Sequence, residues 1–123
     1  MRFDRPLTRV VEWGCGGGAN AVHFAPRSDE FIGVDVVADT LAECTRQVAA
    51  VCETPFTPVL VEVADPEKAL AEIGGNCDLF TSFYAFELIP TPEYGVGILR
   101  IAFETLAPGG AALIHVSTAS GPG

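Results

Sequence analysis

The sequence predicts an α/β fold: a doubly wound, mostly parallel sheet of about five strands with helices on both faces. Two observations predict this class. Five short apolar segments alternate with four helical patterns, which is the sequence signature of a parallel sheet. A glycine-rich turn follows the first segment and an acid ends the second, as in folds that bind a nucleotide at the carboxyl ends of their strands.

The predicted elements divide the chain as follows. Strands rich in β-branched and aliphatic residues are expected at 8–13, 31–36, 59–63, 77–83 and 111–116. Helices are expected at about 18–26, 40–52, 66–73 and 92–106, with loop at 27–30 and a tight turn at 107–110. The 123 residues are expected to form a single domain, 1–123, with an N-terminal arm at 1–7 and a tail at 117–123.

Helical spacing predicts which side chains face the sheet. The second helix has the stripe Leu41, Cys44, Val48 and Val51 or Cys52, and the fourth has Val96, Leu99, Phe103 and Leu106. Asp39 is the expected cap of the second helix. Asp65, followed by Pro66, is in the position of a cap for the third.

The stretch from Val10 to Ala19, V-V-E-W-G-C-G-G-G-A, is the strongest candidate for a binding site. Clustered glycines cost conformational entropy, so they indicate a turn with positive φ or a ligand pressed against bare backbone. The stretch can be interpreted as a dinucleotide fingerprint, as a turn without a ligand, or as a site for a cationic ligand. Glu12, two residues before Gly14, would repel a pyrophosphate and attract a cation.

Asp35 ends the second predicted strand, twenty-one residues after Gly14. That separation fits one helix and a return to the neighbouring strand. A carboxylate there can accept hydrogen bonds from both hydroxyls of a ribose. The alternative is that Asp35 caps the following helix.

The pattern of two apolar residues, an acid, one residue and then G-x-G-x-G resembles motif I of the class I S-adenosylmethionine-dependent methyltransferases. The resemblance extends to the acid at the end of the second strand, the D-L-F-T-S strand with its F-E-L-I-P loop, and the L-A-P-G-G turn. It implies a Rossmann-like fold and S-adenosylmethionine as cofactor. The implied cofactor-binding residues are Glu12, Gly14, Cys15, Gly16, Gly18, Asp35, Val36, Asp65 and Phe83.

Within this resemblance, the acid and the glycines lie beside the methionine part of the cofactor, and Asp65 matches an acid that binds the adenine amino group. Capping and adenine binding are equally weighted alternatives for Asp65. Pro66 departs from the family, because it has no N–H to offer to adenine. Leu88 also stands where family members often have a histidine after the glutamate of the loop.

The family continues with a further helix and two strands, and has helices before the first strand. This chain is therefore expected to be a fragment or a minimal version of the fold. Its fifth strand would be an apolar sheet edge, which predicts self-association.

The composition of the chain limits the classes of binding partner that we expect. The net charge of −9 and the seven scattered basic residues argue against nucleic acid. The four cysteines contain no C-x-x-C pair, so no metal site is expected, and they suit a reducing, cytoplasmic setting. No segment approaches the length of a membrane span.

The function that the resemblance implies is methyl transfer by in-line displacement, and the absence of basic patches favours a small-molecule acceptor. No catalytic residue is assigned: Tyr84, Phe86 and Glu87 lie where an acceptor would approach, and His23 and His115 are weakly placed. Two alternatives stay open. One is an NAD(P)-binding oxidoreductase, although no Tyr-x-x-x-Lys signature is present. The other is a module that keeps the fold without the activity.

Overall fold

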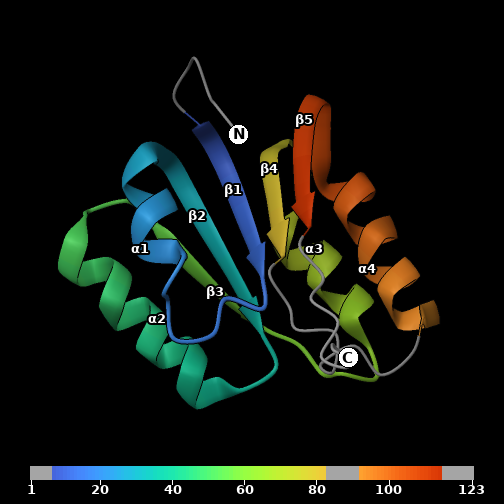
Figure 1. The fold of residues 1–123 in the computed structure, drawn as a ribbon, viewed down its shortest axis with the longest axis horizontal. Helices are drawn as coiled ribbons and strands as arrows, with labels where there is room; N and C mark the ends of the chain where they lie inside the picture. The colour runs from blue at the N-terminus through green and yellow to red at the C-terminus, as the bar shows by residue number, and fades with distance from the viewer. Residues whose placement is uncertain (1–6, 83–91, 115–123) are drawn as a thin grey trace, which may run out of the picture.

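Five parallel strands form one sheet in the order β3-β2-β1-β4-β5 (Figure 1). The computed structural model describes residues 7–82 and 92–114. The elements are β1 (Leu7–Trp13), α1 (Ala21–Phe24), the 3-10 helix η1 (Ala25–Arg27), β2 (Ser28–Asp35), α2 (Ala38–Val51), β3 (Phe56–Leu60), the 3-10 helix η2 (Pro66–Lys68), α3 (Ala69–Ile73), β4 (Cys77–Ser82), α4 (Pro92–Thr105) and β5 (Leu106–Ile114). The predicted doubly wound sheet is confirmed.

The chain reverses its direction of travel across the sheet at β1. It moves outward from β1 through β2 to β3, and then returns to place β4 on the other side of β1. In open α/β sheets, a strand order that reverses in this way marks the place where ligands bind, at the carboxyl ends of the strands on either side of the reversal. That end of β1 carries the glycine-rich turn.

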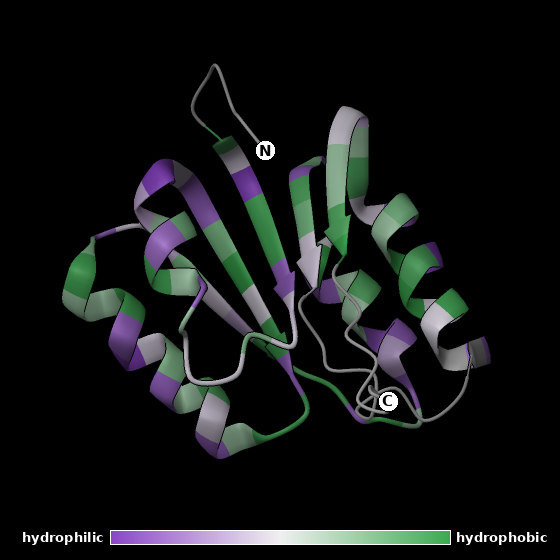
Figure 2. Ribbon diagram, in the orientation of Figure 1, coloured by the Kyte–Doolittle hydropathy of each residue, from purple (hydrophilic) through white to green (hydrophobic). Residues whose placement is uncertain are grey.

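Hydrophobic residues recur along the strands of the sheet (Figure 2). Their side chains form an apolar cluster on each face of the sheet. One cluster includes Val11, Trp13 and Phe80 together with residues of α3 and α4. The other includes Val10, Phe31 and Leu79 together with residues of α1 and α2. Burial on both faces explains why the strands are continuous apolar runs and do not alternate with polar residues.

Strand β2 begins earlier than predicted. The prediction of a loop at 27–30 is wrong, because β2 starts at Ser28 and pairs there with Leu7 of β1. Glu30 pairs with Arg9 in register, and Arg9 Nε donates to Glu30 Oε1 over 2.8 Å. A cross-strand ion pair thus extends the ladder through residues whose polarity alone suggests a loop.

The two edge strands of the described sheet also differ from prediction. Strand β3 covers Phe56–Leu60, where 59–63 was expected, and includes Pro58. Proline is tolerated there because an edge strand needs no donor on its outer side. Strand β5 starts at Leu106, directly after α4. The predicted turn at 107–110 is an irregularity inside it, since Cys77 pairs with Leu106 but Leu79 pairs with Ala111.

The predicted buried stripe of α4 is wrong for three of its four members. Val96, Leu99 and Phe103 are 56%, 43% and 73% exposed. The face of α4 that packs on the sheet carries Ile98, Ile101, Ala102 and Thr105. Helix α4 is apolar on two faces, and helical spacing alone does not choose between them.

Neither predicted cap makes a side-chain hydrogen bond. Val37 occupies the N-cap position of α2, so Asp39 lies inside the first turn and the prediction for it is wrong. Asp65 does occupy the N-cap position of η2, but its side chain makes no capping bond.

Candidate cofactor site

The glycine-rich turn is tied to β2 by its own backbone. Gly14 N and Cys15 N both donate to Val34 O, over 2.7 and 3.0 Å, and Gly18 N donates to Cys15 O over 3.1 Å. These bonds fold the chain back over the end of β2. The turn is therefore already ordered by the protein itself.

Gly16 and Gly18 are required for different reasons. Both have positive φ, +53° and +100°, a conformation that L-residues with a side chain rarely adopt. A Cβ on Gly18 would lie 3.3 Å from Cys44 Cα, so α2 packs directly on that glycine. A Cβ on Gly16 would meet no atom within 4 Å. Gly18 thus allows close packing, whereas Gly16 leaves open space over the turn.

Asp35 joins β2 to the turn through three backbone donors. Its Oδ2 accepts from Gly16 N over 2.8 Å, and its Oδ1 accepts from Val36 N and Val37 N over 2.7 and 3.2 Å. The side chain is buried. Asp35 therefore positions the turn and the start of the α2 connection, a role that the sequence interpretation missed when it set ribose binding against capping.

Glu12 is a buried carboxylate beside the turn, with an exposed fraction of 1%. Its Oε2 accepts from Asn20 Nδ2 over 3.1 Å, and its Oε1 has no hydrogen-bond partner among the described residues. Burial raises the pKa of Glu12 from 4.5 to about 7; the bond from Asn20 lowers it and the charge of Asp35 raises it. A buried acceptor without a partner is a place for a donor from a ligand.

Cys15 and Val36 contribute mainly to packing. The Cys15 side chain is buried, and the neighbouring Cys44 thiol together with burial raises the pKa of Cys15, which keeps its thiol protonated. Val36 is half-buried and packs against the cluster on the α3 and α4 face. All four cysteines are free, and the described residues contain no group of three or more His, Cys, Asp or Glu that could hold a metal ion.

Two predicted site residues are not joined to this group. Asp65 is half-exposed and its Oδ2 lies 3.8 Å from Lys68 Nζ, and no hydrogen bond or ion pair among the described residues links it to Glu12 or Asp35. Phe83 lies outside the described residues, as do Tyr84, Phe86, Glu87 and His115. His23 is exposed at the end of α1.

The geometry disfavours a pyrophosphate at this turn. A phosphate cradle needs free backbone N–H groups at the start of a helix. Here the N–H groups of Gly14, Cys15, Gly16 and Gly18 donate within the protein, and α1 has only four residues. Two carboxylates, Glu12 and Asp35, lie at the same place, which suits a ligand with positive charge.

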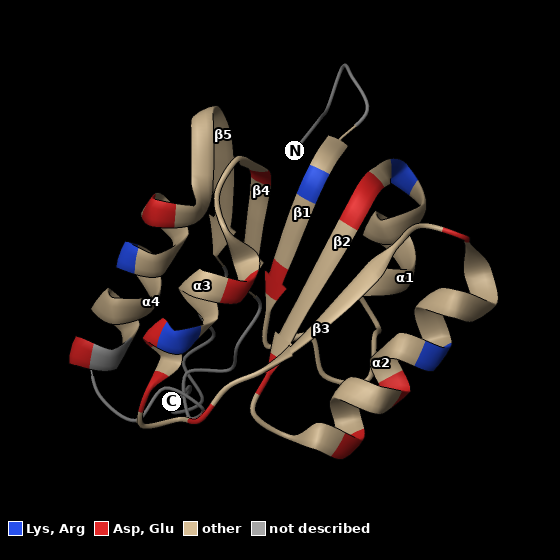
Figure 3. Ribbon diagram, turned by 180° about the vertical axis from the view of Figure 1, so that it is seen from behind, with Lys and Arg blue, Asp and Glu red and all other residues tan. Residues whose placement is uncertain are grey.

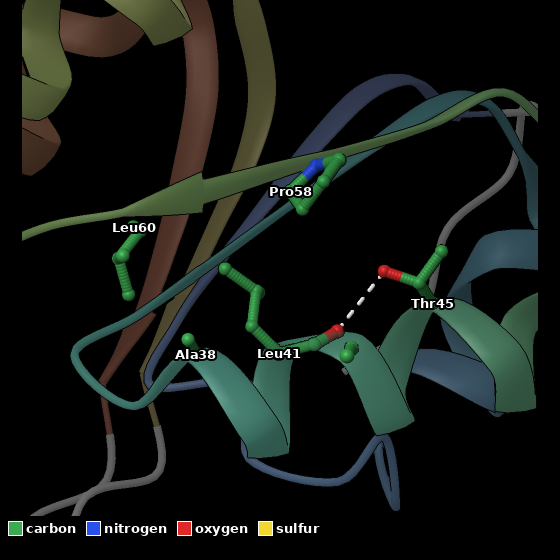
Figure 4. A pocket seen from close by; sticks show the side chains of 6 residues that line it. Ala38, Leu41, Thr45, Pro58 and Leu60 are labelled. Carbon is green, nitrogen blue, oxygen red and sulfur yellow. Dashed lines mark hydrogen bonds between the residues drawn. The ribbon is translucent and has the colours of Figure 1, made fainter.

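Two hollows lie near these elements. One, of about 350 Å³, lies between α2 and the edge strand β3 and is lined by Ala38, Leu41, Ala42, Thr45, Pro58 and Leu60 (Figure 4). Its one hydroxyl, on Thr45, donates to Leu41 O over 2.9 Å, so this groove presents chiefly apolar surface. The other, of about 330 Å³, borders the turn and is lined by Gly17, Gly18, Ala19, Val22 and Gln47.

Asn20 is the residue that the sequence interpretation missed. Asparagine before a helix is usually taken as a cap, and this assumption hides other uses. Asn20 follows the buried acid Glu12 by eight residues. This spacing predicts no contact, because the conformation of the turn between them decides whether the two side chains meet.

Comparisons with known proteins agree with this fold. The chain superposes on an N-methyltransferase, NodS, from Bradyrhizobium japonicum (TM-score 0.70, 14% identity, 89% of this chain and 58% of that one). It also superposes on an rRNA methylase from Streptococcus thermophilus (0.72, 14%, 91% and 63%) and on a methyltransferase from Thiobacillus denitrificans in complex with S-adenosylhomocysteine (0.66, 17%, 89% and 42%). At these identities the likeness shows the fold alone.

The chain spans 42% to 63% of the length of these three solved structures. A search of the curated proteins finds no match to it. A family model described as a methyltransferase domain matches residues 10–110, which include both Glu12 and Asp35. The chain therefore belongs to the methyltransferase domain family, and the resemblance seen in its sequence is confirmed at the level of family and fold.

Proposed function

We propose that this chain is the cofactor-binding domain of an S-adenosylmethionine-dependent methyltransferase that acts on a small-molecule acceptor. The observation that carries the proposal is the pair of buried carboxylates at the glycine-rich turn, with one oxygen of Glu12 left as an acceptor. S-adenosylmethionine carries an ammonium and a sulfonium, so it supplies the positive charge that this pair favours. Gly16 leaves the space that such a ligand would fill.

The chemistry follows from the cofactor. When bound, the cofactor would supply a methyl group: the acceptor would form its bond to the methyl carbon as the bond from that carbon to sulfur breaks, and S-adenosylhomocysteine would be the product that leaves. The protein's part in such a displacement is to hold the two reactants in line, an effect worth up to about 7–11 kcal/mol when alignment is good. The described residues that would hold the cofactor are Glu12, Gly16 and Asp35.

The small-molecule acceptor is supported by charge. Within the described ranges, Lys and Arg are spread over β1, η1, α2, η2 and α4 and form no patch (Figure 3). An RNA acceptor needs clustered cations to neutralise phosphates. In the same part of the chain, no helix combines the length and the apolar character needed to span a membrane.

Isothermal titration calorimetry with S-adenosylhomocysteine and with NADH tests the cofactor. We expect heat from the first and none from the second. NADH binding alone would favour the oxidoreductase alternative, and the absence of both would contradict the proposal.

The acceptor is tested with S-adenosylmethionine that carries a radioactive methyl group. The protein is incubated with a low-molecular-mass metabolite fraction, with total RNA or with total protein. Label in the metabolite fraction is the expected result. Label in RNA or protein would overturn the acceptor class. Cofactor binding without any label transfer would favour a module that keeps the fold but not the activity.

A further inference from the structure

The Glu12 carboxylate makes a single hydrogen bond among the described residues. It is 1% exposed, and Asn20 Nδ2 lies 3.1 Å from its Oε2. The structure gives Oε1 no partner in the described ranges. The amide of Asn20 therefore fixes which of the two oxygens stays available to a ligand.

Asn20 is not needed as a helix cap. It occupies the N-cap position of α1, but its side chain makes no capping hydrogen bond. Two donors of its first turn are bonded through the backbone: Val22 N donates to Gly18 O over 3.1 Å, and His23 N donates to Asn20 O over 3.0 Å. The Asn20 side chain is thus directed to Glu12 and away from the helix end.

The groups that surround Glu12 oppose its negative charge, with the exception of Asn20. Burial within the β1 strand and the charge of Asp35 from β2 both raise the pKa of Glu12, and only the bond from Asn20 lowers it. Cys15, on the turn, is a protonated thiol without charge. No described Lys or Arg forms an ion pair with Glu12.

We propose that Asn20 is a positioning residue that keeps the buried Glu12 carboxylate ionised and oriented, with Oε1 presented to a cationic group of the ligand. The proposal rests on the proposed function, since the cation is the ammonium of the cofactor. Asn20 thereby joins the residues of the site. It acts through Glu12 and not by contact with the methyl acceptor.

The first test is independent of any ligand. The side-chain carboxyl carbon of Glu12 is titrated by NMR in the free protein, for the wild type, Asn20→Ala and Asn20→Asp. We expect a midpoint at about 7 in the wild type and a higher midpoint in both variants. Gln47→Ala is the control, because Gln47 is a second amide beside the turn but donates to Glu43. An unchanged midpoint in the Asn20 variants would overturn the proposal.

The second test is the pH profile of S-adenosylhomocysteine affinity. In the wild type we expect affinity to rise with pH and to level off above about 7, since only ionised Glu12 attracts the ammonium. In Asn20→Ala the rise should move to higher pH, so that affinity falls about ten-fold near neutral pH and recovers at about pH 8.5. Glu12→Gln should bind weakly without such a rise.

A loss of affinity that is equal at every pH in Asn20→Ala would indicate a merely structural role and overturn the proposal. Asn20→Asp keeps the size of the side chain, so it serves if the alanine variant does not fold. If the wild type fails to bind S-adenosylhomocysteine at any pH, the proposed function fails, while the NMR midpoints still decide whether Asn20 controls Glu12.

Discussion

The two halves of the described sheet are built differently. In the half formed by β1, β2, α1 and α2, polar groups meet at the strand ends: Asp35 accepts three backbone N–H groups and Asn20 donates to Glu12. In the half formed by β4, α4 and β5, α4 exposes three large apolar side chains, Val96, Leu99 and Phe103, the last of them to 73%. The buried carboxylates and their contacts lie in the first half, and the most exposed large apolar side chain of the described residues, Phe103, lies in the second.

This difference shows where each half is sensitive to substitution. Buried polar groups depend on specific partners, so a change at one atom removes a contact that nothing else replaces. Apolar helix faces depend on burial alone, so a change at an exposed position costs little. Substitutions in the first half should alter ligand binding, and those on the outer face of α4 should alter association.

The largest expected effect is loss of ligand binding in Gly16→Val. Valine is strained at a φ of +53°, and its side chain would occupy the open space over the turn. We expect S-adenosylhomocysteine affinity, measured by calorimetry, to fall by about 100-fold or more, because the ligand and the side chain would compete for the same volume. Gly75→Ala is the control, since a Cβ there also meets nothing within 4 Å but lies at the far end of the sheet. Equal affinity in folded Gly16→Val protein would place the ligand elsewhere.

The next effect is expected for Asp35→Ala, which leaves the N–H groups of Gly16, Val36 and Val37 without their acceptor. Orphaned buried donors cost about 1–3 kcal/mol each, reduced here by partial exposure, so we expect a loss of about 2–4 kcal/mol in the free energy of unfolding. Urea denaturation of the free protein measures it. Ligand affinity should also fall about ten-fold or more. A variant as stable as the wild type would show that Asp35 acts on the ligand alone.

Glu12→Gln should stabilise the free protein at neutral and higher pH. The pKa of Glu12 is raised from 4.5 to about 7 in the folded state, so the folded state binds more protons than the unfolded state between these values. Stability should therefore fall as pH rises from about 4.5 to about 7, and stay level above. The full difference is on the order of 3 kcal/mol.

Urea denaturation at about pH 4.5 and about pH 8 compares the two proteins across this window. We expect the variant to gain stability relative to the wild type only at the higher pH, and to bind S-adenosylhomocysteine more weakly. A difference that does not change with pH would contradict the assignment. If stability rises while affinity falls, the buried carboxylate of the first half serves ligand binding at a cost to the stability of the free protein.

The smallest effect on stability is expected on α4. Phe103→Ser should change the free energy of unfolding by less than about 0.5 kcal/mol, because the side chain is largely exposed. Ile101→Ala, on the buried face of the same helix, should cost about 2–5 kcal/mol. Similar losses in the two variants, measured by urea denaturation, would show that the outer face of α4 is covered in solution.

We further propose that the chain self-associates through β5, which lies at the edge of the described sheet, and the adjacent outer face of α4. Light scattering at rising concentration should show association in the wild type and less in Phe103→Ser. A stable monomer at all concentrations would contradict this expectation.

Much of the fold followed from the sequence because its signals are local. The apolar runs of β1 and β4, the stripe of Leu41, Cys44 and Val48 on α2, and the end of α3 at Gly74 all lie where they were predicted. The positions of Glu12, in the last two residues of β1, and of Asp35, at the end of β2, also agree with the sequence analysis, while their role in cofactor binding stays a prediction. An acid in the last two residues of a buried strand lies at the carboxyl edge of a parallel sheet, whatever the rest of the chain does.

The tertiary structure alone decided the features that depend on contacts between residues distant in sequence. Helix α4 has two apolar faces of helical spacing, and only packing against the sheet selects Ile98, Ile101 and Ala102 over Val96, Leu99 and Phe103. Ser28 and Glu30 belong to a strand because β1 supplies their partners. The bond between Asn20 and Glu12 exists because the glycine-rich turn folds back on β2, and no spacing in the sequence encodes the distance across that turn.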